Sequence, residues 1–263
     1  MTLSLFFVTM GKLALAPLVL CCREETMKYQ IHQHRFAEDI VNSNPELKKL
    51  WIEITETLDG ITDDALIAEF TTPPEFMAFG KTESGNLRKR PSNKMSLSAA
   101  INNLIDDGLV SKGWNFQSKI FQGKNYDSSR WRLDFSKRIS NPHNDITGIA
   151  IEVAFNHGEA IAWNLMKPTL AAEINHVETE IEIGSGIGVY ICPMSALRKS
   201  GAFDNTVGTY EKVLRYLNPL HQKITVPMLI VGLEEPESFS VEKVFDKISR
   251  QNEGKILYKP EQH

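Results

Sequence analysis

The sequence predicts a mixed α/β domain with a central sheet, because segments of helical and of strand periodicity alternate along the chain. Apolar residues recur at helical spacing through residues 44–60, whereas residues 118–156 alternate apolar and polar side chains. Two continuous apolar runs, at 186–194 and 226–233, have the length of buried strands. The 263 residues, of which 42% are hydrophobic and 24% charged, are enough to build a substantial core.

The helical segments carry recognisable start and stop signals. The first, 44–60, opens with Asn-Pro-Glu and closes with a glycine. The second is expected to be capped by Ser96 and to end near Gly108. The third spans 159–178 and contains Pro168, which predicts a break or the start of a new helix there.

The remaining segments are assigned from composition. Residues 206–220 have the pattern of an amphipathic helix. Residues 69–94, rich in proline, glycine and polar side chains, are predicted to form a long loop. The charged tail after Pro236 is expected to be peripheral.

Charge and cysteine content restrict the class of protein. The net charge of −4 argues against a general nucleic-acid coat, although it does not exclude a DNA enzyme, for which only the local field at the groove matters. Three cysteines, two of them adjacent, cannot form a disulfide framework, and no C-x-x-C pair is present for zinc. A cytoplasmic protein without a membrane partner is therefore expected.

The N-terminus has an unusual composition. Residues 1–22 are almost uncharged and resemble the core of a signal peptide, but Lys12 lies inside the apolar run rather than before it. Met27 opens a segment typical of the start of a soluble protein. We expect residues 1–26 to be an extension or a misassigned start and 27–263 to form a single domain. The alternative is an exported protein of unknown role.

Two predicted strands each carry a carboxylate on their polar face. In residues 148–155 the branched and aromatic side chains share one face, and Glu152 shares the other with glycine and alanines, which would let a large group approach the backbone. In residues 130–135 Asp134 lies on the face opposite the apolar side chains. As antiparallel neighbours these strands would present both carboxylates together, as a hard divalent cation such as Mg²⁺ requires. The alternative is an exposed ion pair with the adjacent arginines.

The motifs LDFSKR and GIAIEVAF resemble the core of the PD-(D/E)XK nucleases, and more narrowly the type II restriction endonucleases related to BglII and BstYI. LWIEITETL (50–58) is similar to that family's first helix, and LVSKGW (109–114) to the segment before the catalytic strands. TYEKVL and VPMLIVGL are similar to its last helix and strand. The resemblance covers most of residues 45–235 and implies a restriction-endonuclease-like core, a central mixed sheet flanked by helices.

By this resemblance the chain is expected to be a homodimeric, Mg²⁺-dependent endonuclease of a restriction system that cuts double-stranded DNA at a short palindrome. Asp134 and Glu152 match the family's catalytic, metal-binding carboxylates, and Asp145 is the alternative to Asp134. The family's third active-site position carries Gln, Glu or Lys, but here it is Ala154. Either another group replaces that side chain, or the protein binds specific DNA with weak or no cleavage.

Further positions follow from the same resemblance. The turn 155–158 occupies the place of residues that face the major groove, although Asn-His-Gly is also ordinary turn chemistry. The loop 200–210 matches a family recognition loop, and the basic run 88–94 is suited to phosphate contacts, the alternative being a solvated loop. Glu53 and Glu56 match family positions near the metal, or are two exposed helix acids. The residues expected to contact DNA are Asn156, His157, Asn205, Thr206, Arg88, Lys89, Arg90 and Lys94.

Overall fold

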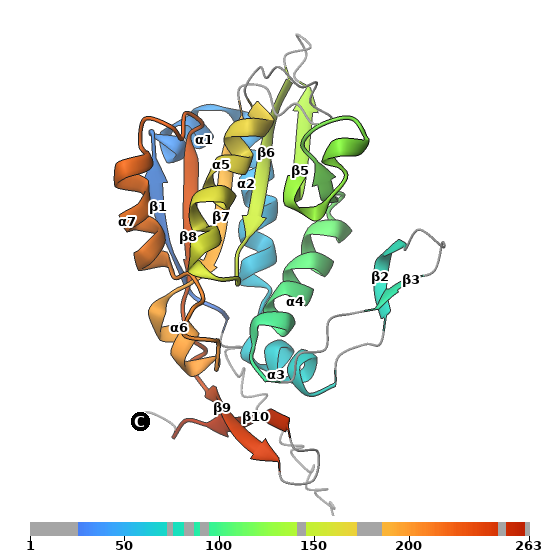
Figure 1. The fold of residues 1–263 in the computed structure, drawn as a ribbon, viewed down its shortest axis with the longest axis vertical. Coiled ribbons are helices and arrows are strands. Elements are labelled where there is room, and N and C mark those ends of the chain that lie inside the picture. Colours follow the sequence, from blue (N-terminus) through green and yellow to red (C-terminus); the bar gives the residue numbers. More distant parts are fainter. Residues whose placement is uncertain are drawn as a thin grey trace, which may run out of the picture.

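A six-stranded central sheet places the two predicted carboxylate strands next to each other. The computed structural model describes residues 26–72, 76–81, 87–89, 95–140, 146–172, 186–246 and 251–260. Across the sheet the strands follow the order β1-β8-β7-β6-β5-β4 (Figure 1). They comprise Tyr29–His34 (β1), Asn115–Lys119 (β4), Arg132–Ser140 (β5), Ile146–Val153 (β6), Ile187–Pro193 (β7) and Met228–Leu233 (β8).

The sheet is mixed, as the sequence predicted. Strands β6, β7 and β8 run parallel, whereas β5 is antiparallel to β6, β4 to β5, and β1 to β8. Parallel neighbours need crossover connections. Helix α5 (Ile161–Ala172) lies in the connection from β6 to β7, and helices α6 (Ser195–Ser200) and α7 (Tyr210–Leu220) lie between β7 and β8.

One face of the sheet is covered mainly by α2 (Pro45–Asp59) and α4 (Ser98–Ser111), with α1 (Ala37–Ser43) and α3 (Asp63–Thr71) beside them. Asn44 caps α2, because its side chain accepts a hydrogen bond from the Leu47 N–H at 3.0 Å. Helices α2 and α4 approach closely at Gly108, where a Cβ atom would collide with the methyl group of Thr57. The apolar face of β5 and β6 packs into this core through Phe135, Ile149 and Ile151.

The other face is covered by α5 and α7. Ala154 lies in a buried cluster with Ile161 and Leu165 of α5, and Ala150 lies in a second cluster with Ala171. The small residues of β6, expected to let a large group approach the backbone, therefore make room for helix α5. Strand β6 is buried on both faces, as is usual for the parallel part of a sheet.

Two hairpins lie outside the central sheet (Figure 1). Strands β2 (Phe76–Lys81) and β3 (Leu87–Lys89) pair within the region predicted to be a long loop, so that prediction was partly wrong. Strands β9 (Phe239–Asp246) and β10 (Gln251–Tyr258) pair after Pro236. The start of β9 is not peripheral, because Phe239 and Val241 belong to the main core cluster.

Some predicted ends of elements were also wrong. The N-cap residue of α4 is Leu97 rather than Ser96, and the helix continues past Gly108 to Ser111. Pro168 lies inside α5 without breaking it, although its ring removes one hydrogen bond of the helix. Strand β5 begins at Arg132, after two short 3₁₀ turns between β4 and β5. The expectation for residues 1–26 falls almost entirely outside the described residues, which start at 26.

His34 closes strand β1 in a buried position. It is 5% exposed, and its Nε2 lies 3.0 Å from the Ile224 carbonyl oxygen. Because a carbonyl only accepts, Nε2 carries the proton in this contact. Burial lowers the pKa of His34, opposed in part by this hydrogen bond. No helix within the described ranges is long and apolar enough to cross a membrane.

Candidate active site

The two predicted carboxylates lie across from each other on β5 and β6. Phe135 pairs with Ile151 in the antiparallel register, so the next positions, Asp134 and Glu152, are direct neighbours on the opposite side of the sheet. Glu152 is 2% exposed. The sequence prediction that both carboxylates share one face is therefore met by the geometry.

Asp134 is held by two hydrogen bonds. Its Oδ2 accepts the main-chain N–H of Val153 at 2.8 Å, and its Oδ1 accepts the side-chain amide of Gln117 at 3.1 Å. Gln117 has a φ of 52°, a left-handed conformation that is uncommon for a residue with a side chain. Burial raises the pKa of Asp134, while the Val153 N–H, the charge of Lys167 and Gln117 lower it. The carboxylate is thus fixed in orientation.

Glu152 pairs with a buried lysine from the covering helix. Lys167 of α5 places its Nζ 2.9 Å from Glu152 Oε2, with the lysine side chain 10% exposed. Within the described part of the chain, the other oxygen, Oε1, is buried without a hydrogen-bond partner. Burial raises the pKa of Glu152 well above its usual range, and the charge of Asp134 raises it further, whereas Lys167 and the main-chain N–H of Asp134 lower it.

Sequence reasoning did not identify Lys167. A signal was present, because Lys167 is the only charged residue between Glu159 and Glu173, in a mainly apolar helix. A lone lysine in such a helix either extends to solvent or meets a buried carboxylate. The sequence could not say which carboxylate, because α5 and β6 meet only in the folded chain.

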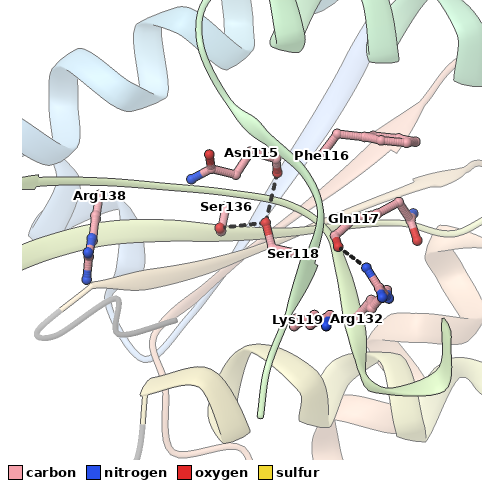
Figure 2. A pocket seen from close by; sticks show the side chains of 8 residues that line it. All are labelled: Asn115, Phe116, Gln117, Ser118, Lys119, Arg132, Ser136 and Arg138. Carbon is pink, nitrogen blue, oxygen red and sulfur yellow. Dashed lines mark hydrogen bonds between the residues drawn. The ribbon is translucent and has the colours of Figure 1, made fainter. Parts of the chain in front are cut away.

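A pocket of about 350 Å³ borders this site on the β4–β5 side (Figure 2). Arg132 donates to the Gln117 carbonyl at 3.1 Å, next to the residue that holds Asp134. Lys119 and Arg132 both pair with Asp127, at 2.7 and 2.9 Å, and Lys119 chiefly holds the pKa of that carboxyl below its usual value. The pocket is lined by Asn115, Phe116, Gln117, Ser118, Lys119, Arg132, Ser136 and Arg138, three of which are cationic.

The two predicted base-reading segments lie side by side. His157 forms a β-bridge with Val207, and the Gly158 N–H donates to the Thr206 carbonyl at 2.7 Å. The main chain of Asn156 accepts from the Gly208 N–H at 3.0 Å. The four predicted side chains Asn156, His157, Asn205 and Thr206 are exposed. They form one polar surface, the loop surface, immediately after the end of β6.

The other candidates lie elsewhere. Glu53 accepts from Lys137 at 2.7 Å and from the Trp114 indole at 2.9 Å, and Glu56 pairs with Lys112 at 2.8 Å. Both acids belong to α2, on the sheet face opposite Glu152, so the structure does not bring them to the carboxylate pair. Arg88 and Lys89 belong to strand β3, whereas Arg90, Lys94 and Asp145 fall outside the described residues.

The donor set is small and suits a hard cation. Among the described residues, no three His, Cys, Asp or Glu side chains gather as a metal-binding cluster. One or two carboxylates are nevertheless enough for Mg²⁺, which usually keeps several waters. The buried Glu152 Oε1, which has no partner among the described groups, is a carboxylate oxygen of the type that this ion prefers.

Comparison with known proteins identifies relatives of this architecture. A family model described as restriction endonuclease BglII/BglIII matches residues 29–233. The crystal structure of restriction endonuclease BglII complexed with a DNA 16-mer matches with a TM-score of 0.50 and 22% identity, covering 88% of this chain and 90% of that one. Free BglII matches with a TM-score of 0.40 and 20% identity, covering 88% and 94%. No curated protein sequence matched.

Proposed function

The chain belongs to the BglII/BglIII restriction endonuclease family, and on that premise we propose that it hydrolyses double-stranded DNA at a short palindromic site as a Mg²⁺-dependent homodimer. As a type II restriction endonuclease it acts on DNA site-specifically. We further propose that residues 27–263 work as one nuclease domain with DNA recognition loops.

The observation that carries this proposal is the carboxylate pair on β5 and β6. Asp134 and Glu152 are neighbours in register, and the Val153 N–H joins the two strands by donating to Asp134. Both side chains are proposed as the catalytic and metal-binding residues. A buried carboxylate beside a half-buried one is costly to the fold, which favours a role in chemistry over one in stability.

Restriction endonucleases generally need a divalent cation, and Mg²⁺ is proposed here because the donors are carboxylate oxygens. Asp134 and Glu152 would hold it. When bound, the ion stabilises the negative charge that builds up on a phosphate under attack. The protein orients the two carboxylates through the Val153 N–H, Gln117 and Lys167.

DNA contact is proposed at two surfaces of different chemistry. The loop surface offers Asn and His side chains whose donors and acceptors match base edges in the major groove. Arg88, Lys89, Arg90 and Lys94 are proposed to contact phosphates, together with the cations that line the β4–β5 pocket. The solved relative of the same fold is a complex with DNA, which supports a DNA substrate.

A homodimer follows from the proposed substrate. A palindromic duplex has two-fold symmetry, and a two-fold dimer presents the same loop surface and carboxylate pair to each strand. Each chain would then cut one strand.

A second candidate function is a sequence-specific DNA-binding protein of the same fold with weak or no cleavage. The observation in its favour is Ala154, which is 2% exposed and offers no side chain at the family's third active-site position. Specific binding in Ca²⁺ with no cut in Mg²⁺ or Mn²⁺ would establish this alternative.

The test is cleavage of DNA of known sequence in Mg²⁺ and in EDTA, with the fragment ends sequenced. Defined ends, cut only with the metal and abolished by Glu152→Ala, are expected. The matched control is Glu53→Ala, which removes a half-buried acid on the opposite face of the sheet. Equal cutting by wild type and Glu152→Ala would remove Glu152 from the site.

A further inference from the structure

We propose that Lys167, delivered by helix α5, serves as the third active-site residue in place of the missing side chain at position 154. The inference rests on the proposed function and names a residue that the family pattern does not supply. In this proposal the Lys167 ammonium contacts a non-bridging oxygen of the phosphate being cut, and its hydrogen bond holds the Glu152 carboxylate in place.

Ala154 lies beneath helix α5, on the Glu152 side of the sheet. It follows Glu152 by two residues, so it lies on the same side of the sheet, and it packs in a cluster with Ile161 and Leu165 of α5. The covering helix therefore occupies the space that a longer side chain at 154 would need. The same helix brings Lys167 Nζ to within 2.9 Å of Glu152 Oε2.

Lys167 lies in a buried environment. Its side chain is 10% exposed, and within the described residues its hydrogen-bond partner is Glu152 alone. A buried ion pair of this kind contributes little to stability and is often outperformed by apolar residues of the same volume. The pair is therefore better explained by a requirement for positive charge at the carboxylates than by packing.

The Lys167 ammonium has N–H donors that Glu152 Oε2 does not use. A lysine carries three N–H donors, and one is used by Glu152 Oε2. The remaining donors lie at the carboxylate whose other oxygen, Oε1, accepts no hydrogen bond from any described group. Removing one donor aimed at charge that develops in a reaction typically slows the step about 100- to 1000-fold.

A comparison within the same sheet provides a control. Lys137 of β5 makes an equivalent pair with Glu53 at 2.7 Å, with side-chain exposures of 21% and 18%, but it lies on the other face of the sheet. Lys137→Met removes a lysine–glutamate pair without touching the carboxylate site. Lys167→Met removes the same type of pair at the site.

The experiment compares wild type, Lys167→Met and Lys137→Met in two measurements. Single-turnover cleavage is followed at saturating Mg²⁺ and Mn²⁺, and Mn²⁺ binding to the DNA-free protein is measured by electron paramagnetic resonance. For Lys167→Met we expect cleavage to fall at least about 100-fold at every metal concentration. Mn²⁺ binding should change little, because removing a competing positive charge favours the cation whereas the higher pKa of Glu152 without Lys167 opposes it. Lys137→Met should keep wild-type values for both.

Two results would overturn the inference. One is cleavage by Lys167→Met within about threefold of wild type. The other is recovery of its cleavage at high Mn²⁺, which would mean that Lys167 acts only through metal loading. Absence of any cutting by wild type overturns the proposed function itself and is distinguishable from both.

A chemical variant guards against misfolding. Lys167→Cys is assayed before and after aminoethylation, which rebuilds an ammonium side chain of nearly lysine length in the same preparation. Recovery of at least about tenfold in rate is expected, and wild type treated in parallel controls for the native cysteines, of which Cys192 is buried. Modified protein that stays as slow as the cysteine variant, with circular dichroism matching wild type, contradicts the inference.

Discussion

The Lys167–Glu152 pair should cost the metal-free protein stability, and a double variant measures how much. Both side chains are at least nine-tenths buried, and Glu152 Oε1 accepts no hydrogen bond within the described structure. A buried polar atom left in this way costs about 1–3 kcal/mol. Replacing a buried ion pair by apolar residues of similar volume commonly stabilises a protein by about 1–4 kcal/mol. Glu152→Met/Lys167→Met is therefore expected to be more stable than wild type by an amount in this range.

The single variants should behave in the opposite way. Either single substitution leaves an unpaired buried charge, which typically lowers the free energy of unfolding by about 3–5 kcal/mol. Urea unfolding in EDTA, followed by circular dichroism, gives the free energy of unfolding of all four proteins as a double-mutant cycle. A double variant less stable than wild type would refute the reasoning, since the pair would then be a stabilising element of the fold.

Three further outcomes are expected. Gly108→Ala should lower the free energy of unfolding by about 1–3 kcal/mol despite alanine's better helix propensity, because its Cβ collides with Thr57. Adding Thr57→Ser should restore most of the loss in thermal melts. Since burial depresses the pKa of His34, the unfolded chain protonates first, so stability should be full above about pH 6.5 and fall as the pH drops below it. Urea titrations at several pH values should show a smaller fall in His34→Gln. His157→Ala and Asn205→Ala should each weaken specific DNA binding about 10- to 100-fold in Ca²⁺ and leave non-specific binding nearly unchanged, as fluorescence anisotropy would report.

Local pattern was sufficient to predict the elements with a long, uninterrupted signal. The helix at Pro45–Asp59 was predicted from its helical periodicity, and the strands β7 and β8 from continuous apolar runs of strand length. The carboxylate pair followed from alternation along two strands that are neighbours in sequence. Short hairpins such as β2–β3 carry too few periodic residues among prolines and glycines to be recognised.

The rest of the site depends on contacts between distant segments. Lys167 reaches Glu152 only because α5 crosses β6, and no local pattern encodes that crossing. The same crossing explains why Ala150 and Ala154 are small, since both pack against α5. In the sequence, small residues beside a carboxylate are compatible with either an open surface or a closely packed helix. In the structure they pack against helix α5.

The joining of the loop surface to the end of β6 has a consequence for altering the target of this enzyme. Only three residues separate Glu152 from Asn156, and main-chain hydrogen bonds fix this stretch, from Ala154 to Ile191 and between Asn156 and Gly208. On the proposed role of the loop surface in reading bases, a mispaired contact there should displace the Glu152 carboxylate, because the connection between them is short and hydrogen-bonded. Discrimination between DNA sequences should appear in the rate of cutting as well as in affinity. Variants selected for tight binding to a new sequence should accordingly need a second selection for speed.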